Sequence, residues 1–142
     1  KKFRYQRLLF KLSYCLFLDK KIKINYFTIK NQKKFPSRDF LDIRDLTILI
    51  SKIIIKTKKS VKNYKIYNVG KGESISLNHV INIFNKYSAK KIKIELKKID
   101  KNEYFHTLAS NDKVKKKFKW VPKINMENSV LSYLKFLRID KK

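Results

Sequence analysis

Three aspartates stand three positions apart in segment 38–46, which reads RDFLDIRDL. Carboxylates at close spacing could serve as a general acid and base. Aspartate is also favoured at turns, strand ends and helix caps, where its side chain accepts backbone hydrogen bonds. Such structural roles explain Asp39, Asp42 and Asp45 more simply than catalysis does, and we expect Asp45 to cap a helix.

Metal and nucleophile chemistry find little support in the other residues. The chain has two histidines, His79 and His106, a single cysteine, and no His-Glu-x-x-His or paired Cys-x-x-Cys motif, so we expect no metal site. Cys15 lies in an apolar run, which predicts a small buried side chain rather than a nucleophile. One cysteine cannot form a disulfide within the chain, and this favours the reducing cytoplasm.

Both glycines of the chain lie in one turn, segment 67–74, which reads YNVGKGES. No lysine followed by Ser or Thr comes after the turn, so it is not a phosphate-binding nucleotide loop. Gly70-x-Gly72 also lacks the third glycine of the dinucleotide fingerprint. We therefore expect the two glycines to serve backbone geometry, because they permit a turn that a side chain would hinder.

Apolar periodicity predicts the elements that position these residues. Helical spacing predicts five helices, over about residues 5–18, from Asp45 onward, and after capping residues Ser76, Asn111 and Asn125. Strand patterning marks residues 22–26, 64–69 and 92–96, the last with one wet face, whereas residues 30–37 should form a polar loop. The helix after Asp45 carries the broadest apolar face, so we expect it to be the most buried helix.

The alternation of helices and strands, without an internal repeat, is typical of an α/β fold. A chain of 142 residues with 43% hydrophobic content can bury one core, and we expect residues 1–142 to form a single unit. The longest nearly apolar stretch, residues 8–18, is shorter than the roughly 20 residues that cross a membrane. No membrane span is expected.

The net charge of +26 could indicate a polyanionic partner. Only five of the 37 basic residues are arginine, and the chain is also rich in Ile and Asn, so AT-rich codons could account for most of the excess lysine. Nucleic-acid readers favour arginine, whose planar fork fits phosphate and guanine. The lysine run at residues 113–119 is therefore expected to be a solvated helix face, with a nucleic-acid-binding module as the alternative.

A third landmark, segment 119–123, reads KWVPK and holds the only tryptophan. Together with segments 38–46 and 67–74, in this order and spacing, it resembles the C-terminal half of the NAD-dependent epimerase/dehydratase family. These are extended short-chain dehydrogenase/reductases that act on nucleotide sugars. That family carries an Arg-Asp-Phe/Tyr-Ile-His-Val-x-Asp-Leu segment, then Tyr-Asn-Val/Ile-Gly-x-Gly, then Gly-Trp-x-Pro. The resemblance covers about residues 8–138.

The resemblance implies the C-terminal substrate-binding part of an extended short-chain dehydrogenase/reductase, a Rossmann-type α/β fold without its N-terminal NAD-binding half. The complete enzyme would transfer hydride between a nucleotide sugar and NAD or NADP, and would be a homodimer. The cofactor fingerprint and the catalytic Tyr-x-x-x-Lys belong to the N-terminal half, so we expect this chain to be a fragment that alone binds no cofactor and is inactive. Three Tyr-x-x-x-Lys matches occur, Tyr26/Lys30, Tyr67/Lys71 and Tyr87/Lys91. We expect none to be catalytic, because a chain so rich in lysine gives such matches by chance, and because the first two fall on strands or turns and the third at a helix end.

The resemblance also implies substrate-binding residues. Arg38 would contact the diphosphate of the nucleotide sugar, and Asn25 and Tyr26 would border the base. Lys101 stands in the loop where the family usually has a second phosphate- or ribose-binding arginine. Two further departures are Asp42, in place of His or Tyr, and Lys119, in place of the glycine before tryptophan. Besides the nucleic-acid module, a truncated, inactive relative that acts through a partner chain is a second alternative.

Overall fold

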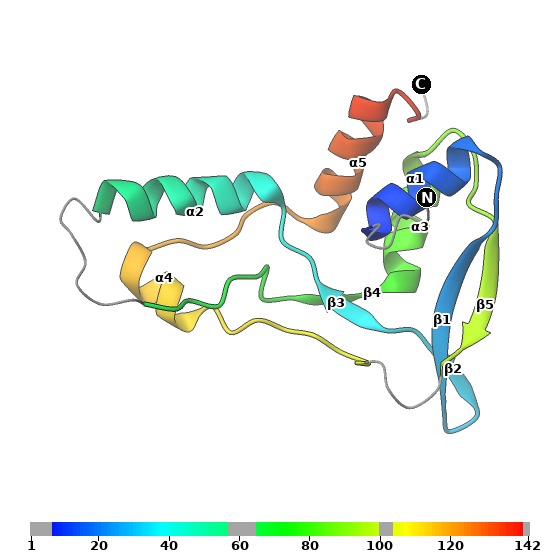
Figure 1. The fold of residues 1–142 in the computed structure, drawn as a ribbon, viewed down its shortest axis with the longest axis horizontal. Coiled ribbons are helices and arrows are strands. Elements are labelled where there is room, and N and C mark those ends of the chain that lie inside the picture. The colour runs from blue at the N-terminus through cyan, green and yellow to red at the C-terminus, as the bar shows by residue number, and fades with distance from the viewer. Residues whose placement is uncertain (1–6, 57–64, 100–103, 141–142) are drawn as a thin grey trace, which may run out of the picture.

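The structure is a computed structural model, which describes residues 7–56, 65–99 and 104–140 (Figure 1). Five helices and five strands lie within these residues. In chain order they are α1 (Leu8–Phe17), β1 (Ile22–Ile29), β2 (Gln32–Lys34), β3 (Ser37–Asp39), α2 (Ile43–Lys56), β4 (Ser74–Ser76), α3 (Leu77–Tyr87), β5 (Ile94–Lys98), α4 (Asp112–Phe118) and α5 (Met126–Leu137).

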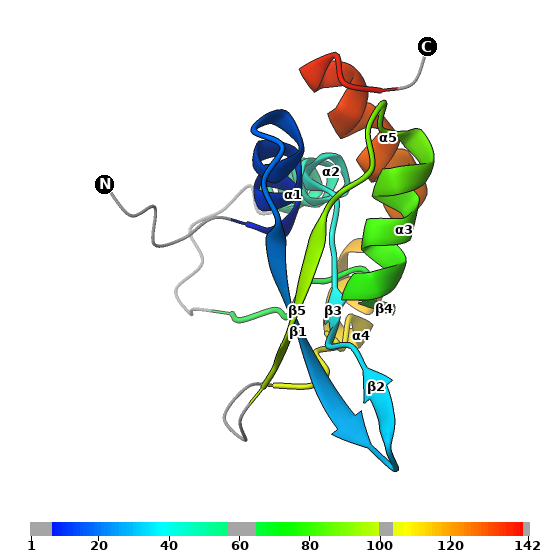
Figure 2. The same ribbon diagram turned by 90° about the vertical axis from the view of Figure 1, so that its right-hand side faces the viewer.

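The strands form two small sheets. The larger has the order β2-β1-β5, with β1 antiparallel to β2 and parallel to β5, so that Ile22 lies opposite Ile94 and Tyr26 opposite Lys98. Figure 2 shows β1 and β5 as a twisted pair with β2 at its far end. The second sheet pairs β3 with β4 in antiparallel fashion, with Arg38 opposite Ile75. The fold is therefore mixed α/β, as the alternation of elements predicts.

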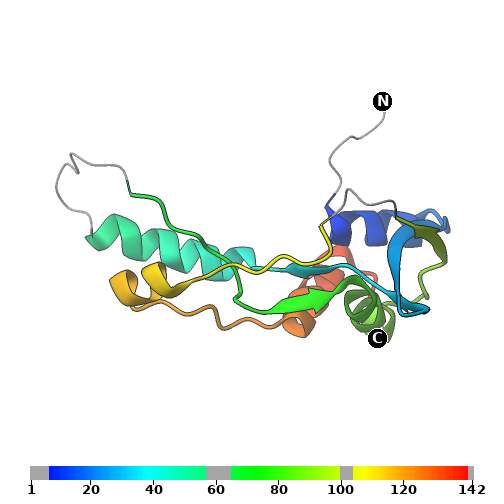
Figure 3. The ribbon, with the colours of Figure 1, turned by 90° about the horizontal axis from the view of Figure 1, so that it is seen from below.

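Two hydrophobic clusters hold the chain together. The first joins α1, β1, α3 and α5 and comprises Leu12, Leu16, Ile22, Ile24, Val80, Ile81, Ile83, Phe84, Ile92, Met126, Val130 and Leu134. The second joins α2 to α4 through Leu49, Val114, Phe118 and Trp120. The molecule is elongated, with the second cluster at the end formed by α2 and α4 (Figure 3).

Several predicted elements are confirmed together with their local chemistry. The Ser76 hydroxyl accepts a hydrogen bond from the His79 backbone N–H (3.2 Å) and begins α3. The Asn125 amide oxygen accepts from the Asn128 backbone N–H (2.8 Å) and begins α5. Each cap satisfies one of the N–H groups that a helix start leaves without a partner.

The predicted polar loop at residues 30–37 is wrong, because half of it belongs to strands, namely Gln32–Lys34 and Ser37. Lys30 and Asn31 adopt φ angles of +48° and +58°, the left-handed region that a two-residue hairpin turn requires. The chain then returns as β2 and enters β3 at Ser37. The strand β5 is confirmed, but it has no buried face: all five of its side chains are exposed.

The expectation that α2 is the most buried helix is also wrong. Only Asp45 and Leu49 are buried, whereas five isoleucines of α2 are exposed. They are Ile43, Ile48, Ile50, Ile54 and Ile55. In the strand predicted after α2, Tyr64 lies outside the described residues, and residues 65–69 pair with no strand in the described part of the chain.

Lys119 ends α4 in the left-handed conformation, with φ 48° and ψ 46°. Its backbone N–H donates to the Lys115 carbonyl (2.9 Å). A β-carbon makes this conformation costly, which is why glycine is the usual residue after a helix. Lys119 stands where the family that this chain resembles has glycine, and its backbone is therefore strained at this position.

We expect Lys119→Gly to raise the free energy of unfolding by about 1 kcal/mol, because glycine adopts positive φ without a steric penalty. Urea denaturation measures the change. Lys116→Gly, in the exposed interior of the same helix, is the matched control and should lower the stability by about 1 kcal/mol. A Lys119→Gly protein that is no more stable than the original would show that Lys119 carries no backbone strain.

Candidate binding site at Arg38

Arg38 lies in β3 and is half-buried. Its guanidinium Nη1 donates to the Ser37 carbonyl oxygen (2.8 Å) and, with a longer contact, to the Phe105 carbonyl oxygen (3.4 Å). These bonds fix one nitrogen of the Arg38 guanidinium. A guanidinium is planar and can bind phosphate oxygens with two parallel hydrogen bonds. The structure thus positions the one predicted arginine as a partly anchored cation.

The segment that begins at Tyr104 connects β3 with β1. The Ser37 backbone N–H donates to the Phe105 carbonyl (2.9 Å), and the ring of Phe105 meets that of Phe27 edge-on at 5.0 Å between centroids. Ser37 Oγ and His106 Nδ1 lie 2.8 Å apart. Arg38 and the start of the β1–β2 hairpin are therefore tied to the same short segment, which the sequence pattern did not reveal.

Asn25 and Tyr26 occupy the middle of β1, and both are half-buried. The Lys33 ammonium lies 5.2 Å from the centroid of the Tyr26 ring, close enough for a cation–π interaction. Tyr26 accordingly offers an aromatic face that is only partly covered. Lys101, the fourth predicted site residue, lies outside the described residues.

The Asp39 carboxylate joins the first landmark segment to the glycine turn. It accepts hydrogen bonds from the backbone N–H groups of Lys71 (2.5 Å), Gly72 (3.0 Å) and Ala109 (3.0 Å). A carboxylate with three such donors is structural, as the sequence predicts for Asp39. The turn's N–H groups therefore point at a side chain of this protein, where those of a nucleotide-binding loop point at a phosphate.

The two glycines serve backbone geometry, for two different reasons. A β-carbon at Gly70 would lie 2.5 Å from Asp39 Oδ2 and 2.6 Å from Ala109 Cβ, so no larger residue fits. Gly72 has a φ of +76°, a conformation that side chains disfavour. Space at one position and conformation at the other account for the Gly-x-Gly spacing.

Asn111 clamps the same turn from the other side. Its buried amide group accepts from the Gly70 backbone N–H (3.0 Å) and donates to the Gly70 carbonyl (2.8 Å). The prediction that the Asn111 side chain caps α4 is therefore wrong, because its hydrogen-bonding atoms are used on Gly70. No local sequence signal distinguishes these two uses of an asparagine before a helix.

Asp45 plays a similar part between the first and third landmarks. Its backbone carbonyl accepts from the indole Nε1 of Trp120 (3.1 Å), and its Oδ2 accepts from the backbone N–H groups of Lys123 (3.0 Å) and Ile124 (2.8 Å). The predicted cap is wrong for this residue. Asp42 takes that role, since its Oδ1 accepts from the Arg44 backbone N–H (2.9 Å) at the start of α2.

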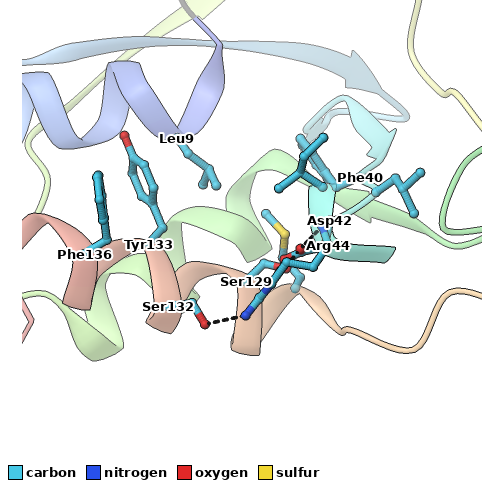
Figure 4. A pocket seen from close by; sticks show the side chains of 11 residues that line it. Leu9, Phe40, Asp42, Arg44, Ser129, Ser132, Tyr133 and Phe136 are labelled. Carbon is cyan, nitrogen blue, oxygen red and sulfur yellow. Dashed lines mark hydrogen bonds and ion pairs between the residues drawn. The ribbon is translucent and has the colours of Figure 1, made fainter. Parts of the chain in front are cut away.

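Asp42 and Arg44 also line a pocket of about 500 Å³ between α1, the start of α2 and α5 (Figure 4). The Arg44 side chain hydrogen-bonds Asp42 and donates to Ser132 Oγ (3.1 Å), while Ser129 Oγ donates to Asp42 Oδ2 (2.6 Å). The hydrogen bond from the Arg44 side chain holds the pKa of Asp42 far below its usual range. An aspartate held in its charged form is suited to joining α2 to α5 and poorly suited to proton transfer.

Cys15 and the His, Asp and Glu side chains of the described residues form no further candidate catalytic site. Burial raises the pKa of the Cys15 thiol, which weakens it as a nucleophile, and Cys15 packs against the first hydrophobic cluster. Within residues 7–56, 65–99 and 104–140, no three His, Cys, Asp or Glu side chains are grouped so that they could hold a metal ion. In the same ranges no helix has the length and apolarity needed to cross a membrane.

The sequence matches no protein-family model and no curated protein. Solved structures do resemble it. UDP-glucose 4-epimerase from Bifidobacterium longum, in complex with NAD+ and UDP, matches 84% of this chain with a TM-score of 0.71 and 18% identity. UDP-glucuronic acid 4-epimerase from Bacillus cereus, in complex with NAD, matches 92% with a TM-score of 0.66 and 19% identity. UDP-glucose-4-epimerase from Stenotrophomonas maltophila, with bound NAD and formylated UDP-arabinopyranose, matches 97% with a TM-score of 0.79 and 8% identity.

The chain has the fold of part of these enzymes. It covers 35%, 38% and 42% of their respective lengths, so it spans well under half of each solved chain. The α/β fold expected from the resemblance is therefore confirmed. At these identities the comparison supports the fold, and the activity of the present chain has to be argued from its own residues.

We expect Asp39→Asn to lower the free energy of unfolding by roughly 2–3 kcal/mol. The substitution removes the negative charge and replaces one acceptor oxygen by an NH2 group, which cannot accept the backbone N–H bonds that Asp39 receives. Chemical denaturation measures the loss. Asp19→Asn is the matched control, since that exposed carboxylate bonds only to Lys93 in the described structure and its loss should have little effect. Similar losses in the two variants would show that Asp39 does not tie the segments together.

Proposed function

We propose that this chain is the substrate-binding C-terminal portion of an NAD(P)-dependent nucleotide-sugar epimerase, dehydratase or reductase. The observation that carries the proposal is the position of Arg38, presented beside the Asp39 clamp on a fold shared with part of three UDP-sugar epimerases. The complete enzyme would transfer hydride between the sugar and the nicotinamide cofactor. Its location would be the cytoplasm and its assembly a homodimer.

The proposed substrate contacts follow from the chemistry of the site. The guanidinium of Arg38 suits a diphosphate, because paired charge-assisted hydrogen bonds favour two neighbouring phosphate oxygens. Tyr26 offers a face on which a base could stack, and Asn25 offers an amide that could bond its edge. Lys101 would supply a further charge to the phosphate or ribose.

The described residues do not fit the dinucleotide cofactor. The glycine turn has its N–H groups on Asp39 and leads into β4 rather than directly into a helix. Tyr26 lies in β1 with Lys30 in the hairpin turn, and Tyr87 is the last residue of α3, so neither pair lies on one helix face. We propose that NAD or NADP is held by the remainder of the complete enzyme.

The exposed side of α2 supports the view that a further α/β unit packs here. Ile43, Ile54 and Ile55 are each about two-thirds exposed (68%, 67% and 67%). Ile66 is 86% exposed, and residues 65–69 make no strand pairing in the described chain. An apolar helix face beside an unpaired extended segment suits the edge of an incomplete sheet.

The coding sequence upstream of this chain provides the first test. We expect it to encode a strand-Gly-x-x-Gly-x-x-Gly-helix segment followed by a Tyr-x-x-x-Lys pair, because the fold matched here supplies neither. Sequencing of the genomic region and of the transcript makes the observation. If no such segment precedes the chain, the enzyme assignment fails for this gene and an inactive relative that pairs with a partner chain replaces it.

We expect the chain to bind UDP, and Arg38→Gln to weaken that binding by about tenfold or more, because a charged hydrogen-bond donor is lost from the diphosphate. Isothermal titration with UDP and with uridine measures the loss and its dependence on the phosphates. Arg44→Gln removes the same group from the pocket at Asp42 and is the matched control. The role of Arg38 is contradicted if the original chain does not bind UDP, or if both variants lose affinity equally.

A further inference from the structure

A second charged site lies at the end of the molecule opposite the β1–β2 hairpin. A hollow of about 670 Å³ opens between the end of α2, residues 65–67 and α4. Its described lining consists of Ile66, Tyr67 and five lysines, namely Lys56, Lys65, Lys113, Lys116 and Lys117. Figure 1 shows α4 and the end of α2 together, far from β3, which carries Arg38.

The hollow concentrates positive charge without a compensating carboxylate. No Asp or Glu is among its described lining residues, and none of the five ammonium groups takes part in an ion pair within the described chain. Like charges held around one space repel each other. A bound anion would relieve that repulsion at all five lysines at once.

The floor of the hollow is rigid. Lys56 Nζ donates to the Lys117 backbone carbonyl (2.6 Å) and lies 6.0 Å from the centroid of the Phe118 ring. Tyr67 packs edge-on against the same ring, at 5.4 Å, and Phe118 is itself part of the second hydrophobic cluster. The ammonium groups from α2 and α4 are thus mounted on packed elements, which reduces the ordering cost of binding a ligand.

We propose that this hollow binds a compact oligophosphate anion. Its volume of about 670 Å³ lies within the range of about 300–1,000 Å³ typical of small-molecule sites and suits a ligand of a few phosphate groups. Lysine ammonium groups act as point charges toward phosphate oxygens and need no fixed planar geometry. The site is separate from the nucleotide-sugar contact proposed at Arg38. Residues 65–67 line the hollow and also belong to the edge at which the further α/β unit would join, so the proposal applies to the present chain on its own.

Inorganic tripolyphosphate is the probe that tests the proposal. Titration of the full chain should give saturable binding and a rise in the melting temperature. Lys113→Gln, Lys116→Gln and Lys117→Gln combined should raise the Kd about tenfold or more, because three charges are removed from one hollow. The matched control combines Lys11→Gln, Lys91→Gln and Lys135→Gln, which removes the same charge from exposed positions elsewhere and should leave the Kd almost unchanged.

Three outcomes would overturn the site. Equal losses in the two triple variants would show binding to net charge alone. Loss of tripolyphosphate binding in Arg38→Gln, with the hollow's lysines intact, would place the anion at the nucleotide site. A duplex DNA oligonucleotide that binds through Lys113, Lys116 and Lys117 while tripolyphosphate does not would identify a nucleic-acid surface. Failure of UDP binding at Arg38 would leave the result at the hollow unaffected.

Discussion

One carboxylate determines how the centre of this molecule is assembled. Asp39 accepts hydrogen bonds from Lys71, Gly72 and Ala109, which belong to two segments that follow it at distances of about 30 and 70 residues along the chain. A buried or half-buried carboxylate is favourable only when several donors replace its water. That requirement fixes Arg38 beside the turn and leaves Gly70 no room for a side chain.

A second aspartate extends the same principle to the first turn of α2. Asp45 binds the backbone after Trp120 through its carboxylate and the indole through its carbonyl. The Trp120 ring then closes the small cluster between α2 and α4. The three sequence landmarks are therefore connected physically, because hydrogen bonds join each pair of them. Asp39 binds the glycine turn, Asp45 binds the segment at Trp120, and Lys71 Nζ donates to the Pro122 carbonyl oxygen (3.1 Å).

Sequence patterns predicted what depends on neighbours in the chain. The caps at Ser76 and Asn125 bond groups three residues away, and the stripes of α3 and α5 repeat every turn, so both were predictable from local rules. Asp45 and Asn111 were misassigned because the same residue types that cap helices also bind distant backbone groups, and only the fold decides between them. The β2 strand reads QKK and is exposed, so it lacks the apolar alternation from which a strand can be predicted.

The helix α2 preserves evidence of a contact that this chain alone does not make. One side of it is buried through Asp45 and Leu49, yet five isoleucines of the same helix are exposed, with Thr47, Ser51 and Lys52 as exposed residues between them. A helix that is apolar on both sides is normally buried on both sides. The pattern of α2 is therefore best explained by a second apolar layer, and the unpaired segment 65–69 marks the edge at which that layer would join.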